Sequence, residues 1–306
     1  MKRTPLITSF LTGLILLTFA GCINLKKVND YSSCSLQSIK NFEYLDYSFT
    51  KACYDAGKLQ RIHNADFRLD TSKFDCSANQ LADSITFLIY NALHCYFEGL
   101  TKLSGNELTD YNTDTLANTL IKAKISDSTI KAYSKISNLL LHAVTDEYRK
   151  KKIQQYIGEA NESVKVLLTE LDFQLSQNLV GKLKTQEVKI NNIYYGYFLE
   201  TNQRDTIFHS SFNLTTDTLY LKSKNSYERL LIIKEYDAEL AALRNKENQI
   251  ICFTKGLRMI AEGHQQLYDN RKGLTVRKFN ELISFYSSRI KNILNEFTIL
   301  KTSSHE

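Results

Sequence analysis

The chain has 306 residues and a formal net charge of +6. This length is enough for one large domain or two modest domains that bury most of their apolar surface. The charge is too small to indicate a nucleic-acid-binding protein.

The N-terminus carries a short apolar run. It begins with Lys2 and Arg3 and continues from Leu6 to Ala20, which is about fifteen residues. A bilayer-spanning helix needs roughly 20 apolar residues, so the run is short for a membrane span. A positive start, a short apolar middle and small residues at the end are typical of a cleaved export signal.

The sequence Ala20-Gly21-Cys22 follows this run and resembles the lipobox of bacterial lipoproteins. The resemblance implies diacylglyceryl transfer to the thiol of Cys22, cleavage after Gly21 and acylation of the new amino group. Phe19 departs from the pattern, because the family most often has Leu there. The alternative is an uncleaved signal anchor with a chance cysteine. Several acyl chains on Cys22 would hold the protein durably on a membrane.

The residues after Cys22 indicate an address within the envelope. Ile23, in place of Asp, resembles lipoproteins sorted to the outer membrane, and residues 23–29 lack the acidic cluster associated with surface display. We therefore expect an outer-membrane lipoprotein that faces the periplasm. Loss of residues 1–21 would leave 285 residues with a formal charge of +4. The polar, serine-containing residues 22–36 are predicted to be a flexible tether.

The composition of the mature chain predicts an all-α fold. The sole proline is Pro5, and the whole chain has only eleven glycines, so almost nothing interrupts a helix. We expect an antiparallel bundle of six to seven mostly long amphipathic helices in a single domain over residues 37–301. Residues 302–306 are predicted to be a polar tail.

The apolar positions place the helices along the chain. One stripe begins at Ile39 and Gly57 is a candidate for its early end, and a second helix is predicted over 77–104 with Gly105 as its stop. Helix-start residues at 126–129 precede a stripe over 130–148. Four further segments complete the prediction. A stripe over 157–183 that extends toward 197 is either one long helix or two helices joined at Gly158, Gly181 or Gly196. A loop over 201–225 and helices over 226–270 and 279–300 follow.

Five cysteines remain besides Cys22. A hairpin of the first two helices would bring Cys34 toward Cys95, and Cys53 toward Cys76, so these two disulfides are predicted for an oxidising compartment. Cys252 has core-like helical spacing and is interpreted as a buried small side chain.

The chain lacks the sequence motifs of common catalytic and cofactor sites. It has no Glu-x-x-His, His-x-x-x-His, Cys-x-x-Cys, Gly-x-Ser-x-Gly, Gly-x-Gly-x-x-Gly or phosphate loop. No catalytic residue, metal ligand or cofactor is therefore predicted. His264 lies on an apolar helix face, where it is either a ligand or base in a cavity or, in the favoured interpretation, a core-edge histidine hydrogen-bonded to a neighbouring helix.

Two clusters are candidates for surface contacts. Arg149-Lys150-Lys151-Lys152 is interpreted as a solvated helix face, with contact to anionic head groups as the alternative. Tyr194, Tyr195, Tyr197 and Phe198 cannot all face one core from a helix, so they are either a partner's landing site or packed against another segment.

These features predict a non-enzymatic interaction or scaffold module. The membrane would hold it through the lipid on Cys22, and its partner would be another envelope protein rather than a nucleic acid. The alternative is a helical bundle that binds a small ligand or a metal ion.

Overall fold

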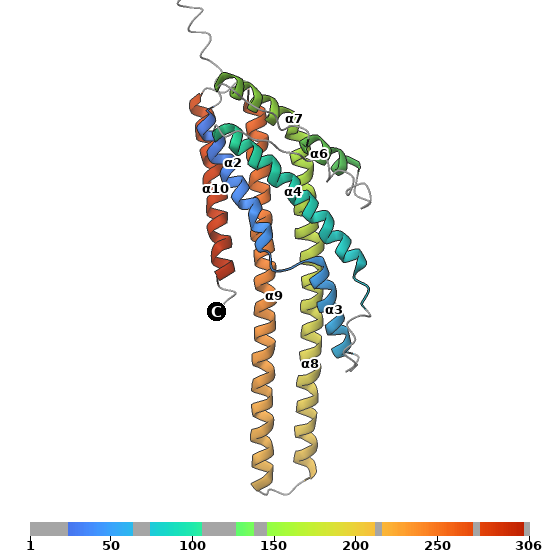
Figure 1. Cartoon of the computed structure of the whole chain (residues 1–306). Coiled ribbons are helices and arrows are strands. Elements are labelled where there is room, and N and C mark those ends of the chain that lie inside the picture. The colour runs from blue at the N-terminus through green and yellow to red at the C-terminus, as the bar shows by residue number, and fades with distance from the viewer. Residues whose placement is uncertain are drawn as a thin grey trace, which may run out of the picture. The chain divides into compact units, whose positions relative to one another are not determined.

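The computed structural model describes residues 24–63, 74–105, 127–137, 146–211, 216–271 and 276–302. Within these ranges the regular structure is helical and no strand is present (Figure 1). The prediction of an all-α fold is confirmed. The predicted signal sequence 1–21 and the predicted lipidation site Cys22 lie outside the described residues. In the predicted tail, Thr302 ends the last helix and residues 303–306 also lie outside them.

The helices are long, as a chain with a single proline near its start permits. The predicted helix over 77–104 is present, as are a start within 126–129, an end at Asn270 and a helix covering 279–300. The helices are α2 (Leu25–Lys40), α3 (Phe49–His63), α4 (Ser77–Gly105), α6 (Asp127–Ser137), α7 (Asp146–Phe173), α8 (Val180–Ser211), α9 (Thr216–Asn270) and α10 (Val276–Thr302).

The chain divides into two compact units, although one domain was predicted over residues 37–301. Helices α4 and α9 each contribute residues to both units. Unit 1 comprises Met1–Tyr44, Ser84–Phe173 and Cys252–Ile299, and unit 2 comprises Leu45–Asp83, Gln174–Ile251 and Leu300–Glu306. Across the described ranges, no helix contains a stretch long and apolar enough to cross a membrane.

The prediction of a flexible tether over residues 22–36 is wrong from Leu25 onward. Asn24 caps α2, since its side-chain oxygen accepts a hydrogen bond from the backbone N–H of Lys27 at 3.3 Å. Val28 and Tyr31 are fully buried, as are several serines of the helix. The serines were interpreted as linker residues, whereas their small side chains allow close helix packing.

Close packing of α2 against α9 within unit 1 depends on two glycines. A Cβ atom at Gly263 would lie 2.6 Å from the ring of Tyr31, and one at Gly256 would lie 2.6 Å from the hydroxyl of Ser38. The Tyr31 hydroxyl donates a hydrogen bond of 2.6 Å to the carbonyl oxygen of Ile260. The absent side chains therefore create the space in which Tyr31 is completely buried.

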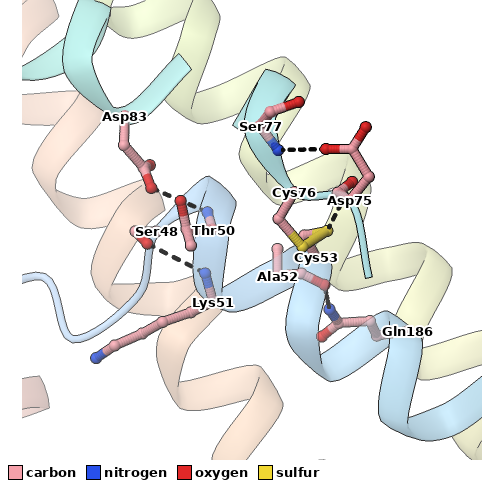
Figure 2. The surroundings of a disulfide bond; sticks show 10 residues. All are labelled: Ser48, Thr50, Lys51, Ala52, Cys53, Asp75, Cys76, Ser77, Asp83 and Gln186. Atoms are coloured by element: carbon pink, nitrogen blue, oxygen red, sulfur yellow. Dashed lines mark hydrogen bonds between the residues drawn. A yellow bond between two sulfur atoms is a disulfide. The ribbon is translucent and has the colours of Figure 1, made fainter. Parts of the chain in front are cut away.

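The helix predicted to begin at Ile39 is interrupted. A short 3₁₀ helix covers Asn41–Tyr44, and α3 starts only at Phe49. Asp83 fixes this start, because its two carboxylate oxygens accept hydrogen bonds from the backbone N–H groups of Phe49 and Thr50 at 2.8 and 2.9 Å (the Thr50 bond is drawn in Figure 2). A cap supplied by a distant carboxylate leaves no local sequence signal.

Two further boundaries differ from the prediction. Helices α7 and α8 join through a π-helical segment, Gln174–Leu179, rather than bending at Gly158, Gly181 or Gly196. The loop predicted over 201–225 is wrong for residues 201–211 and 216–225, which are helical. Their polarity suggested a loop, but a polar sequence without proline can also form a helix.

Candidate functional site

The candidate site lies on a hairpin in unit 2. It is formed by α8 and by the part of α9 up to Ile251, which run side by side in opposite directions (Figure 1). The Arg244 guanidinium donates a hydrogen bond to Glu187 at 3.1 Å across the two helices. Around this ion pair the facing side chains are buried: Leu183, Gln186 and Ile190 on α8, and Leu240, Leu243, Gln249 and Ile250 on α9.

Burial then stops although the apolar sequence continues. Between residues 191 and 200 on α8, and between 226 and 239 on α9, no side chain is buried. Two helices alone cannot enclose the apolar side chains that they carry. This part of the hairpin, which we call the distal hairpin (residues 191–200 and 226–239), therefore exposes a large share of its apolar surface. The large hydrophobic side chains that are exposed there are Tyr195, Tyr197, Leu199, Tyr227, Leu230, Leu231 and Ile233.

A groove of about 550 Å³ follows the seam between the two helices in this region. We call it the aromatic groove. Both helices contribute to it, and only one of its residues carries a formal charge. The lining residues are Asn191, Asn192, Tyr194, Tyr195 and Phe198 from α8, and Ile232, Ile233, Tyr236 and Asp237 from α9.

Contacts between the helices fix the shape of the groove. The Tyr236 hydroxyl donates a hydrogen bond of 3.0 Å to the side-chain oxygen of Asn191. The rings of Tyr194 and Tyr236 lie 5.4 Å apart in a tilted arrangement. Burial, followed by the nearby carboxylates of Glu239 and Glu235, raises the pKa of Tyr194 to about 12. The groove is thus preformed in the free chain.

The four rings of the aromatic cluster predicted from the sequence differ in their burial. Tyr194 and Phe198 are half-buried in the groove, whereas Tyr195 is 66% exposed and Tyr197 is also exposed. Exposure of at least one or two of these rings was predicted. The opposite wall from α9 was missed: its residues lie within the helix predicted over 226–270, but the two helices were not paired. Ile233, 42% exposed, belongs to that wall.

A second cavity of about 690 Å³ lies elsewhere in unit 2 and carries more charge. The Lys246 ammonium lies 4.8 Å from the centre of the Tyr47 ring, and the Lys51 ammonium pairs with Asp46 at 2.5 Å. The Tyr47 hydroxyl donates a hydrogen bond of 2.8 Å to Gln186. The lining residues are Asp46, Tyr47, Lys51, Tyr54, Asp55, Lys58, Phe74 and Lys246.

The predicted disulfide between Cys53 and Cys76 is confirmed (Figure 2). It attaches the residues before α4 to the side of α3. One turn beyond Cys53, a Cβ atom at Gly57 would lie 2.8 Å from the ring of Phe74. Gly57 therefore does not end the helix, as had been considered, but makes room for Phe74 beside the second cavity.

The predicted disulfide between Cys34 and Cys95 is wrong, because both thiols are free. Cys34 lies inside α2 rather than before the first helix, so the assumed hairpin geometry does not apply. Its thiol lies near Lys291 of α10, whereas that of Cys95 lies near Glu98 of α4. Cys252 is buried as predicted, and burial raises its pKa to about 11.

His264 belongs to a buried polar network in unit 1. Its side chain is 1% exposed, so it lies inside the core rather than at the predicted core edge. Its Nε2 atom is 2.6 Å from the Tyr96 hydroxyl, and its Nδ1 atom is 3.0 Å from the Asn161 side-chain oxygen. Asn161 donates to Gln265, which donates to the carboxylate of Asp269.

The carboxylate at the end of this network fixes its direction, because it only accepts hydrogen bonds. Each amide then donates toward Asp269, so His264 donates from Nδ1 and accepts the Tyr96 proton at Nε2. Burial lowers the pKa of His264 to about 3. The interpretation as a hydrogen-bonded structural histidine is thereby favoured over that of a base in a cavity.

The side chains of the basic cluster over residues 149–152 also differ in their burial. Lys151 is exposed, as expected for a solvated face, but Arg149 is buried, which the sequence interpretation missed.

Within the part of the chain that the structure describes, no group of three or more His, Cys, Asp or Glu side chains is placed to hold a metal ion. No family model, no curated protein and no solved structure matches the chain.

Proposed function

We propose that this chain is a lipid-anchored interaction module of a bacterial envelope, and that it binds a protein partner through the aromatic groove. The observation that carries the proposal is the loss of burial after Ile190 on α8 and before Leu240 on α9. Large apolar side chains continue along both helices in these stretches. Contiguous apolar surface of this kind marks interaction sites.

The composition of the groove supports protein recognition rather than catalysis. Tyr supplies large contact area at low entropic cost and is enriched among the residues that dominate binding energy. Tyr194, Tyr195 and Tyr236 all line the groove, and the hydrogen bond from Tyr236 to Asn191 holds its two walls together. A preformed surface loses less conformational entropy when a partner binds.

The lipobox resemblance supports the address. Acylated Cys22 would hold the chain on one membrane surface, which we expect to be the periplasmic face of the outer membrane. There the groove would meet other envelope proteins. Growth with an alkyne-labelled fatty acid tests this part: the wild-type chain is expected to take up label, and Cys22→Ser is expected to lose it. Equal labelling of both chains contradicts the proposed anchor.

Co-isolation from solubilised membranes tests the recognition part. Tyr195→Ala combined with Ile233→Ala truncates one lining side chain in each wall of the groove. Leu231→Ala is a matched control, since Leu231 is 41% exposed on α9 beside Ile233 but does not line the groove. A partner retained by wild type and by L231A, and lost by the double variant, is the expected result. Equal retention by all three chains contradicts the proposal.

Small-ligand binding is a second candidate function, favoured by the cavity of about 690 Å³ beside Tyr47 and Lys246. Native mass spectrometry of the purified chain tests it. A retained small mass that is lost in Lys246→Ala supports this candidate, and a bare chain mass counts against it.

A further inference from the structure

We propose that the occupant of the aromatic groove is a single amphipathic helix of the partner, with Lys or Arg on the flanks of its apolar stripe. This inference rests on the proposed function and specifies the class of partner. Two observations carry it: the shape of the groove and the charge of the distal hairpin, which also argues against a second copy of the chain.

The shape of the groove fits a helix. The groove follows the seam between two antiparallel helices, and its walls come from Tyr195 and Phe198 on one side and Ile233 on the other. A third helix that lies along such a seam places residues at i, i+3, i+4 and i+7 between the walls, which is how amphipathic helices bind apolar grooves. Asn191 and Asp237 line the same groove and offer hydrogen-bond acceptors to side chains at its margin.

The charge of the distal hairpin favours a basic partner. Residues 191–200 and 226–239 contain five acidic and two basic side chains, a formal charge of −3, although the whole chain carries +6. Asp237 lines the groove, and Glu235 and Glu239 lie close enough to Tyr194 to raise the pKa of its phenol. Lys or Arg beside the apolar stripe of a bound helix would meet these carboxylates, which favours association and selects against acidic helices.

A second copy of the same chain fits less well. Face-to-face pairing would bring two hairpins of charge −3 within a Debye length of about 8–10 Å, where their like charges repel. A helix with Lys or Arg beside its apolar stripe meets the same carboxylates with attraction instead of repulsion.

Peptide binding to the full chain in nonionic detergent tests the inference, with protein-free micelles as the blank. Two stapled helical peptides of about 15 residues share one leucine stripe and carry either Lys or Glu on its flanks. We expect the Lys peptide to bind at least about tenfold more tightly at low salt and this ratio to shrink at high salt, because salt screens exposed charges. Equal affinities overturn the inference.

Two variants separate the charge from the groove. Glu235→Lys, Asp237→Lys and Glu239→Lys in one chain are expected to reverse the preference, so that the Glu peptide binds more tightly. The Y195A and I233A double variant is expected to lose both peptides, and L231A to keep wild-type affinities. An unreversed preference, or self-association of the wild-type chain that Y195A abolishes, contradicts the basic-helix assignment. Binding of both peptides without a charge preference would still leave the proposed function in place.

Discussion

The core around His264 and the distal hairpin both gather aromatic rings, but they use them in opposite ways. In unit 1 the rings of Tyr96 and Tyr156 stack 4.9 Å apart, and Tyr96 is completely buried with its hydroxyl bonded to His264. On the distal hairpin, Tyr195 is exposed and no side chain from residue 191 to 200 is buried. The core uses its rings within the chain, whereas the distal hairpin leaves Tyr195 and Tyr197 exposed.

This difference separates stability from recognition. A buried aromatic side chain contributes to folding through area removed from water and through its hydrogen bond. An exposed ring contributes little to folding and keeps its apolar area for a partner. Changes in the unit 1 core should therefore alter the free energy of unfolding, and changes in the aromatic groove should not.

The largest expected effect is a pH dependence that originates from His264. Its pKa is about 3 in the folded chain and about 6.5 in an unfolded one, so protons bind the unfolded state preferentially as the pH falls below 6.5. The stabilisation is complete above pH 6.5 and is lost by up to about 1.4 kcal/mol per pH unit down to pH 3. Urea unfolding at several pH values measures it.

His264→Gln provides the control for this titration, since Gln cannot gain the proton. The difference in unfolding free energy between the wild type and H264Q is expected to change by a few kcal/mol between pH 7 and pH 4. Parallel pH profiles for the two chains would show that His264 is not buried as a neutral side chain.

A slightly smaller effect is expected from the disulfide in unit 2. Cys53 and Cys76 are 23 residues apart, and closure of a loop of this length stabilises a fold by about 3 kcal/mol in the chain-entropy account. Cys53→Ser with Cys76→Ser should lower the unfolding free energy by that amount. Cys95→Ser, which removes a half-buried free thiol, is the control with little expected change. Equal stabilities for all the variants would contradict the assignment.

Gly263→Ala should lower stability by about 1–3 kcal/mol, because the added methyl group meets the buried ring of Tyr31 at 2.6 Å. Gly181→Ala is the matched control, since nothing lies within 4 Å of its added Cβ atom. This exposed helical position should gain about 0.5–1 kcal/mol from the change. Thermal unfolding distinguishes the opposite signs, and a stabilising G263A would contradict the close contact of α2 with α9.

Tyr195→Ala should have the smallest effect on folding, within about 0.5 kcal/mol, as expected for an exposed position. Chemical unfolding of the full chain measures it beside L231A. A loss of more than about 2 kcal/mol for Y195A would mean that the ring packs in a core, and the contrast between the two regions would then fail.

Features encoded by local patterns were predicted correctly. The scarcity of proline and glycine predicts helices. The spacing of apolar residues gives bounds for α4 and α10 that are close to those in the structure. The pair Cys53 and Cys76 was predicted on the premise that the first helix ends at Gly57. The pair is present although α3 continues to His63. The exposure of Tyr195 and Tyr197 follows from the density of aromatic residues after Tyr194, because one helix face cannot hold them all.

Features that depend on distant residues were missed. Asp83 fixes the start of α3 from 34 residues away along the chain, and the buried serines of α2 fit only because Gly256 and Gly263 allow close packing. Cys34 was paired incorrectly because α2 was not recognised as a helix. The α9 wall of the groove lies within the helix predicted over 226–270, but it was missed because apolar spacing along one helix does not show which helix packs against it.

Photo-crosslinking in living cells tests the central claim most directly. A photoreactive amino acid is placed at position 195, inside the aromatic groove, or at position 231, on the same hairpin but outside it. The account predicts a discrete crosslinked envelope protein from position 195, with a basic amphipathic helix at the crosslinked site, and none from position 231. The same crosslinked products from both positions, or none from position 195, would contradict the claim that the groove is the recognition surface.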